Sequence, residues 1–271
     1  MDEELEKLHN LDLLLAKELK RICEKHKIRY FMIAGTLLGA VRHKGFIPWD
    51  DDMDFGMRRS EFERFLQVCL LELDGERFQL QTIDSEEKYP FNFVKMTLKG
   101  THVVEEFSQG KLENNGIFID IFPVDNVFDN RIKAFLQYKL FWLVRNLLLI
   151  KLGYGDESKT GFKIAKMTSA LFSVKFLKRF KELIITSANV KPTQNVVVSD
   201  GTYGLQRETI KSEWVDNLSC FDFDGELFPG IADYHGYLTY FYGNYLTPPD
   251  KNNRNHHKRI KIDFGQYSEI E

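Results

Sequence analysis

Residues 116–125 form the segment that most restricts how this chain can fold. Their sequence, GIFIDIFPVD, is almost entirely apolar and only ten residues long. Such a run predicts a strand buried on both faces, so we expect it at the centre of a β-sheet. One carboxylate, Asp120, interrupts the run. An unpaired charge there would be costly, so Asp120 either meets a cation or strong donors, or binds backbone amides at the strand end.

The remaining pattern predicts an α+β chain. Apolar residues at three- and four-residue steps in residues 4–26 predict an amphipathic helix. Ser60 is expected to cap a second helix, residues 60–73, with Glu63 at the capping-box position. Further helices are predicted within residues 130–183 and 237–246, and strands at residues 28–35, 78–83, 91–100, 101–107 and 196–201. Strands followed by helices and a mixed tail fit this class better than a doubly wound sheet.

The predicted elements divide the chain into three segments. These are a catalytic core (1–129), a basic amphipathic helical subdomain (130–190) and a mixed segment that completes the core (191–271). Between Arg131 and Lys181 the only acidic residues are Asp156 and Glu157. Such basic helices can lie on an anionic membrane surface, or they can pack on the core with their lysines in solvent. Residues 252–259, NNRNHHKR, are expected to form an exposed loop.

Charge and composition exclude several classes of protein. The formal net charge of −3 and the lack of a recognition motif argue against a nucleic-acid partner. The N-terminus lacks the pattern of a signal peptide, and no stretch reaches the roughly 20 apolar residues that span a bilayer. Cys23, Cys69 and Cys220 are scattered, as is typical of reduced core thiols. We therefore expect a cytoplasmic protein, either free or peripheral at the inner membrane face.

The acidic run in residues 48–55, PWDDDMDF, is the strongest indication of chemistry. It holds four carboxylates within five positions between apolar neighbours, where like charges repel and burial is costly. If the run is extended, Asp52 and Asp54 project from one face. Two such carboxylates can share a hard cation, and Mg²⁺ prefers oxygen ligands together with substrate phosphates. With Asp120 they predict a three-carboxylate metal site for Mg²⁺, with Mn²⁺ as an alternative. The competing interpretation is an acidic loop or calcium-type turn, although the EF-hand spacing is absent.

Residues 34–43, AGTLLGAVRH, and residues 45–54, GFIPWDDDMD, together resemble the signature of the LicD family of phosphocholine transferases. Fukutin-type ribitol-phosphate transferases share that signature. The resemblance extends through residues 118–123 and, more weakly, to residues 242–245. It implies a nucleotidyltransferase-like mixed sheet flanked by helices, in which a glycine-containing turn precedes a DxD strand. In this sequence Gly35 and Thr36 occupy the turn.

The resemblance assigns the DxD role to Asp52 and Asp54 and the third carboxylate to Asp120. It implies Mg²⁺-dependent transfer of phosphocholine from CDP-choline, or from another CDP-alcohol, to a sugar hydroxyl. The acceptor would be a cell-surface glycan precursor of the teichoic acid or lipopolysaccharide type, free or lipid-linked. Asp120 either completes the metal site or accepts the proton of the acceptor hydroxyl. Transfer of ribitol phosphate, nucleotidyl transfer and a DxD nucleotide-sugar glycosyltransferase remain alternatives.

Other residues are candidates for substrate contacts. The helix start at Gly35 and Thr36 offers backbone N–H groups to a phosphate. Arg42, followed by His43, is a candidate clamp for the leaving phosphate. Lys95 is either a phosphate contact or an exposed strand residue, and Trp49 is either a core residue or a ring that faces choline. Asp125, which follows Pro123, is expected to cap or fix a turn.

Overall fold

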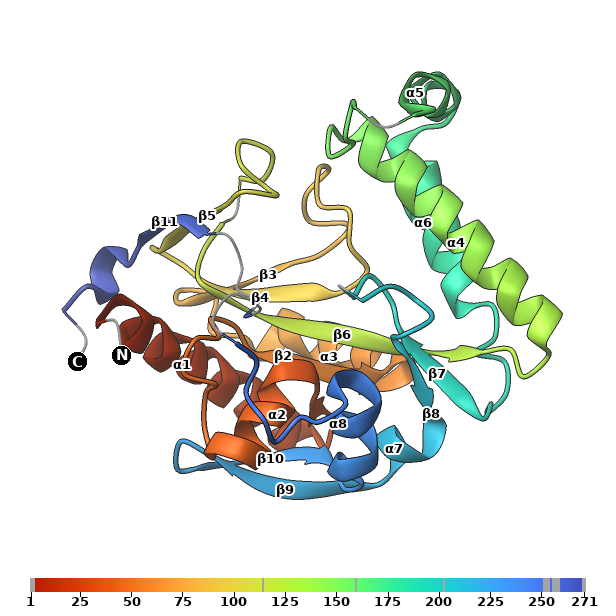
Figure 1. Cartoon of the computed structure of the whole chain (residues 1–271). Helices are drawn as coiled ribbons and strands as arrows, with labels where there is room; N and C mark the ends of the chain where they lie inside the picture. Colours follow the sequence, from red (N-terminus) through yellow and green to blue (C-terminus); the bar gives the residue numbers. More distant parts are fainter. Residues whose placement is uncertain are drawn as a thin grey trace.

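The computed structural model describes residues 3–113, 115–158, 160–201, 203–250, 254 and 259–269. The chain forms one large mixed sheet with helices packed around it and a helical lobe at one side (Figure 1). This arrangement confirms the predicted α+β class. None of the described helices combines the length and the apolar character that crossing a bilayer requires.

Within the described residues, the main sheet has nine strands in the order β3-β4-β6-β2-β1-β10-β9, with β7 and β8 added beside β6. Their bounds are Phe31–Met32 (β1), Asp54–Arg58 (β2), Phe78–Gln81 (β3), Val94–Leu98 (β4), Phe118–Val127 (β6), Asn195–Val198 (β7), Thr209–Lys211 (β8), Leu218–Phe223 (β9) and Glu226–Ile231 (β10). Strand β6 pairs with β2 in parallel and with β4 and β7 in antiparallel orientation. It is buried along almost its whole length, which confirms the central position predicted for residues 116–125.

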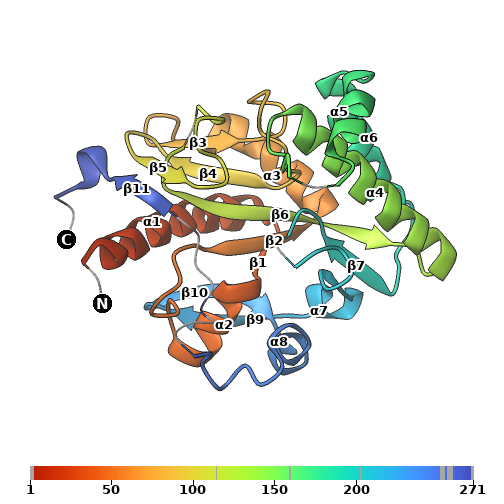
Figure 2. The same ribbon diagram turned by 45° about the horizontal axis from the view of Figure 1, so that its top comes forward.

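Helices cover the sheet from both sides (Figures 1 and 2). Helices α1 (Glu3–His26) and α3 (Arg59–Glu72) pack against β6, while α2 (Ala34–His43) and α8 (Tyr234–Tyr242) pack near β2, β9 and β10. The short α7 spans Ser212–Asp216. The apolar stripe of α1 is buried, as its periodicity predicted. The predicted Ser60 cap is wrong, because β2 runs directly into α3 and Arg58 occupies the N-cap position without a side-chain cap.

The helical lobe consists of α4 (Arg131–Lys151), α5 (Phe162–Ala170) and α6 (Val174–Thr186), which project from one side of the sheet (Figures 1 and 2). Asn130 caps α4 by accepting hydrogen bonds from two backbone N–H groups, and Ser173 caps α6. The lobe has its own apolar cluster, which Phe141, Leu148 and Leu177 help to form and which reaches the sheet through Val127 and Val197.

The structure confirms some local predictions and corrects others. The strand predicted at residues 101–107 is confirmed as β5 (His102–Glu105), but it pairs with β11 (Arg259–Asp263) in a separate two-stranded sheet. The strand predicted at residues 28–35 ends at Met32, because α2 begins at Ala34. Asp125 is not in a turn: it is buried within β6 and accepts hydrogen bonds from Arg59 and Asn189. Cys23 and Cys69 are buried, but Cys220 is exposed.

The expected exposed loop at residues 252–259 lies outside the described residues, apart from Arg254 and Arg259. The Arg259 side chain is largely buried, since it forms an ion pair with Asp51.

Candidate active site

Alternate residues of neighbouring strands line one cavity of about 540 Å³. Asp54, the first residue of β2, and Asp52, two positions before it, both face the cavity. Lys95 of β4 and Asp120 of β6 face it as well. Because side chains alternate along a strand, this face of the sheet collects residues that are scattered in the sequence. The structure therefore brings together the three predicted carboxylates and one predicted cation.

The strand register sets these groups in a row across the sheet. Asp54 is the direct partner of Asp120 in the parallel β2–β6 pair, and Lys95 is the partner of Asp120 in the antiparallel β4–β6 pair. The Lys95 Nζ atom lies 3.9 Å from Asp120 Oδ1 and 3.5 Å from Glu105 Oε2. It also lies 3.1 Å from the ring centroid of Phe118. Lys95 and Asp120 are only 7% and 5% exposed, so water screens this ion pair weakly.

The N-terminus of α2 forms one wall of the cavity, through Ile33 and Ala34. The Thr36 hydroxyl accepts a 2.7 Å hydrogen bond from the backbone N–H of Asp54, which ties the helix to the start of β2. Ala34 adopts a positive φ of 46°, and its N–H donates to the Tyr237 hydroxyl at 3.1 Å. Gly35 lies in the first turn of α2 rather than in a preceding turn.

Gly35 lies in close contact with the acidic run. A Cβ atom there would lie 2.6 Å from Asp50 Oδ2, so a larger residue would force the Asp50 side chain to shift. Glycine at this position thus lets the helix start lie close to the carboxylates as they are placed here. First-turn N–H groups and a dipole that favours anions make such a terminus suited to a phosphate.

Among the described residues, one group of three carboxylates already lies close enough to share a metal ion, and a second group faces the cavity. The carboxylate oxygens of Asp50, Asp51 and Asp52 lie within 4.8 Å of one another. However, Asp51 Oδ2 is 3.2 Å from Arg259 Nη1, Asp50 packs against Gly35, and neither residue lines the cavity. The second set, Asp52, Asp54 and Asp120, faces a space large enough for a phosphate group. Its donors are all oxygen atoms, which fit Mg²⁺ or Mn²⁺.

Three predicted substrate residues lie elsewhere. Arg42, His43 and Trp49 do not line the cavity. Arg42 is near the C-terminal end of α2, roughly 12 Å along the helix from Ala34. Its side chain donates to the Tyr245 carbonyl and to His43 Nε2, both at 2.8 Å. Burial and the neighbouring Arg42 lower the pKa of His43, so that the neutral ring accepts this bond.

The ring of Trp49 is already in contact with guanidinium groups. The Arg254 Cζ atom lies 3.8 Å and the Arg42 Cζ atom 5.8 Å from the ring centroid. Trp49 thus serves as a cation–π partner for two arginines in the free protein. This contact network does not support the predicted roles of Arg42 as a phosphate clamp and of Trp49 as a choline-facing ring.

The cavity also contains charged residues that the sequence did not single out. These are Glu105, Glu106, Arg145, Asp200 and Glu208. Glu208 is 6% exposed, and burial raises its pKa to about 7 although its carboxylate accepts a hydrogen bond from the Tyr203 N–H. It can therefore hold or release a proton near neutral pH.

Asp200 lies at the centre of a buried ion-pair network that joins the lobe to the sheet. It bonds Lys181 of α6 and Arg145 of α4 at 2.9 and 2.8 Å, and it accepts the backbone N–H of Asn92. Burial alone would raise the pKa of Asp200, but the two cations and this hydrogen bond hold it below its usual value. None of these residues belongs to a short sequence motif, so their ion pairs can be recognised only in the folded structure.

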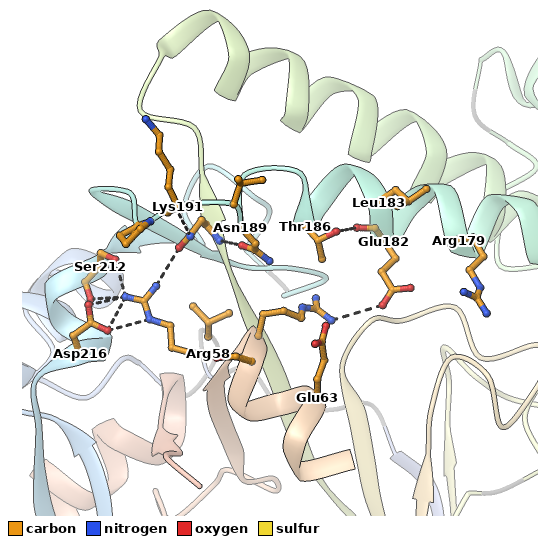
Figure 3. A pocket seen from close by; sticks show the side chains of 16 residues that line it. Arg58, Glu63, Arg179, Glu182, Leu183, Thr186, Asn189, Lys191, Ser212 and Asp216 are labelled. Carbon is orange, nitrogen blue, oxygen red and sulfur yellow. Dashed lines mark hydrogen bonds and ion pairs between the residues drawn. The ribbon is translucent and has the colours of Figure 1, made fainter. Parts of the chain in front are cut away.

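A second cavity, of about 810 Å³, lies between α3 and α6 and contains none of the predicted site residues (Figure 3). Two of its arginines already have acidic partners: Arg58 contacts Asp216 and Ser212, while Arg59 pairs with the buried Asp125. Because this cavity contains none of the predicted carboxylates, the cavity lined by Asp52, Asp54, Asp120 and Lys95, which we call the carboxylate row, is the better candidate for an active site.

Comparison with known proteins places the chain in a family. A model of the nucleotidyltransferase domain of the LicD/FKTN/FKRP family matches residues 27–148, which include Asp52, Asp54, Lys95 and Asp120. The chain is 31% identical over 257 residues to the lipopolysaccharide cholinephosphotransferase LicD of Haemophilus influenzae, covering 87% of this chain and 89% of that protein.

Shorter matches are found in two uncharacterized rickettsial proteins. The chain is 31% identical over 125 residues to a protein of Rickettsia prowazekii, covering 46% of this chain and 45% of that protein. It is 44% identical over 54 residues to a protein of Rickettsia typhi, covering 20% and 18%.

Proposed function

Because the chain belongs to the LicD family, we propose that it transfers phosphocholine from CDP-choline to a sugar hydroxyl of a glycan precursor, with Mg²⁺ as cofactor. The observation that carries this proposal is the row formed by Asp54, Asp120 and Lys95 on the same cavity as Asp52. The Haemophilus relative is a cholinephosphotransferase that acts on lipopolysaccharide. A glycan acceptor of the lipopolysaccharide or teichoic acid type is therefore the first to test.

Asp52, Asp54 and Asp120 would hold the cation. When bound, Mg²⁺ or Mn²⁺ would neutralise charge on the donor phosphates and on the crowded carboxylates. The first turn of α2 and Lys95 add hydrogen-bond donors around the same space.

In the proposed reaction the acceptor hydroxyl oxygen attacks the phosphorus that carries choline. A new phosphorus–oxygen bond forms, the bond to the bridging oxygen of the diphosphate breaks, and CMP leaves with that electron pair. A carboxylate in the cavity accepts the hydroxyl proton, and Asp120 and Glu208 are both candidates. Phosphoryl transfer depends mainly on positioning and on charge neutralisation, which are what these side chains can supply.

Product analysis tests the proposal. Purified protein would be incubated with Mg²⁺, CDP-choline labelled in the choline methyl groups, and either a lipooligosaccharide or a teichoic acid precursor. We expect equal amounts of CMP and choline-labelled glycan. Release of free phosphocholine together with a CMP-modified acceptor would indicate nucleotidyl transfer instead. Activity with CDP-ribitol alone would change the donor but keep the mechanism, and turnover of a nucleotide sugar alone would indicate glycosyl transfer.

We further propose that the lobe, within residues 130–190, contacts an anionic lipid surface at the cytoplasmic face of the membrane, while residues 1–129 and 191–271 form the catalytic core. One side of α4 exposes six large apolar side chains: Ile132, Phe135, Leu136, Leu140, Trp142 and Leu143. Exposed basic residues lie on the same helix (Arg131, Lys133 and Lys139) and on α5, which packs at the C-terminal end of α4 (Lys163 and Lys166). This combination favours an interfacial helix. A second copy on the same face would bring like charges together, which disfavours a dimer.

Vesicle binding tests this contact. We expect the protein to sediment with phosphatidylglycerol vesicles and much less with phosphatidylcholine vesicles, and high salt should weaken the binding. Phe135→Ser should reduce binding, whereas Leu71→Ser should not, because Leu71 is an exposed leucine on α3 outside the lobe. Equal binding of all three proteins, or self-association through α4 without vesicle binding, would rule out the contact.

A further inference from the structure

Four phenylalanine rings form a continuous wall in the cavity that holds the carboxylate row. Phe91, Phe93, Phe107 and Phe122 all line it. Phe91 stacks on Phe93 with ring centroids 4.8 Å apart, and Phe93 contacts Phe122 at 4.5 Å. Phe107 contacts Phe91 at 5.8 Å. We call these four residues the aromatic wall.

The position of the aromatic wall follows from the same alternation that sets the carboxylate row. Phe91, Phe93 and Lys95 follow one another at two-residue steps, and Phe122 comes two residues after Asp120. Lys95 pairs with Asp120 across β4 and β6. Phe93 and Phe122 therefore meet two residues beyond this pair along both segments, roughly 7 Å from the carboxylate row.

The outer part of the aromatic wall is open to a ligand. Phe93 and Phe122 are buried, and packing alone explains them. Phe91, however, is only partly buried, and Phe107 is 48% exposed, although one side of its ring stacks on Tyr154 with centroids 4.8 Å apart. Phe107 follows directly after Glu105 and Glu106, whose side chains line the same cavity. Accessible ring faces beside carboxylates are suited to an organic cation.

The charge of the cavity favours the same class of ligand. Seven acidic residues line it, against the two cations Lys95 and Arg145. Arg145 is paired with Asp200, and Lys95 lies beside Glu105 and Asp120. The lining is thus strongly acidic, which raises the local concentration of cations.

We infer that the aromatic wall binds the trimethylammonium group of the donor while its phosphates lie at the carboxylate row. This inference rests on the proposed choline donor and specifies where choline binds. A quaternary ammonium group has no hydrogen to donate, so ring faces and diffuse negative charge satisfy it fully. A polyol such as ribitol carries no positive charge and would gain no cation–π attraction from phenylalanine rings.

The signal of the choline methyl protons tests this directly, because it does not depend on turnover. Rings that surround these protons shift their signal upfield, so CDP-choline added to the wild-type protein with Mg²⁺ should show such a shift. Phe107→Leu keeps the apolar side chain but removes the ring face, and it should weaken CDP-choline binding about three- to thirtyfold. Phe107→Trp should retain the shift and the affinity.

Two controls separate this inference from the proposed function. Phe172→Leu makes the same change at a stacked phenylalanine in the lobe, and it should leave the methyl shift unaltered. CDP-ethanolamine, whose ammonium group can hydrogen-bond, should lose less affinity than CDP-choline in Phe107→Leu. A wild-type protein without an upfield shift, or a Phe107→Leu protein with unchanged CDP-choline affinity, would overturn the aromatic-wall inference. A clear shift without CMP release would preserve the choline site and contradict the transfer reaction instead.

Discussion

Asp54 on β2 and Asp120 on β6 are direct partners in the register of two parallel strands. The backbone N–H of Asp120 also donates to the Met53 carbonyl at 2.9 Å, so the two strands remain paired up to the edge of the cavity. Two carboxylates held by a central sheet have fixed positions, whereas those of an acidic loop do not. This rigidity is what a preorganised metal and phosphate site requires.

The Thr36 hydroxyl should be needed to position Asp54. Thr36→Val keeps the shape of the side chain but leaves the Asp54 N–H without its acceptor, which costs about 1–3 kcal/mol. We expect lower stability in urea unfolding and a loss in kcat/KM for CDP-choline of about tenfold or more, since small displacements at such a site are costly. Thr36→Ser retains the hydroxyl and should keep most of the wild-type stability and most of the wild-type kcat/KM. A fully active Thr36→Val protein would contradict this role.

Lys95 should contribute to binding of the donor phosphates. Lys95→Met retains the length of the side chain but removes its charge, and the KM for CDP-choline should rise roughly tenfold to hundredfold. Lys99→Met makes the same change at an exposed position just beyond β4, where Lys99 bonds the Gly75 carbonyl, and should leave KM nearly unchanged. Equal KM values for the two variants would show that Lys95 only balances Asp120.

Glu208 should make the free energy of unfolding depend on pH. Its pKa is raised to about 7 in the folded chain, so between about pH 4.5 and 7 the folded state keeps a proton that the unfolded state has lost. Wild-type stability therefore falls as pH rises through this window. The free energy of unfolding of Glu208→Gln should be close to that of the wild type at pH 4.5. At pH 8 it should exceed the wild-type value by at most about 3 kcal/mol. Urea unfolding at both pH values measures the gain, and Glu213→Gln, an exposed carboxylate, provides the control.

Asp200 should be important for the stability of the junction between lobe and sheet. Asp200→Asn leaves the fully buried Lys181 without its carboxylate, and breaking a buried pair in this way costs about 3–5 kcal/mol. Glu157→Gln removes the exposed ion pair with Lys166, which should be worth no more than about 1 kcal/mol. Denaturant midpoints compare the two variants. Similar decreases in the denaturant midpoint of the two variants would mean that the network around Asp200 contributes little to stability.

The central strand and the shared orientation of Asp52 and Asp54 could be predicted from the sequence because their signals are local. An apolar run identified β6, and two-residue spacing put Asp52 and Asp54 on one face. Long-range pairing could not be predicted in the same way. Asp200 and Glu208 reach the cavity through β7 and β8, which pair beside β6 although some 70 residues separate them from it in the chain.

Aromatic residues were the hardest to assign from the sequence. Trp49 lies within the acidic signature, yet its ring contacts Arg254, a residue about 200 positions away. Phe91 and Phe93 lack a motif, and only the pairing of β4 with β6 brings them beside Phe122. The composition of a segment does not determine which face of a ring remains free.

The most direct test of this account compares Mg²⁺-dependent CMP release from CDP-choline in Asp54→Asn and Asp51→Asn. Both changes remove one carboxylate from the same acidic run, but only Asp54 lines the cavity, while Asp51 pairs with Arg259. If Asp52, Asp54 and Asp120 hold the metal, Asp54→Asn should lose activity about hundredfold or more, and Asp51→Asn should lose much less. Loss of activity in Asp51→Asn together with retained activity in Asp54→Asn would contradict the proposed site.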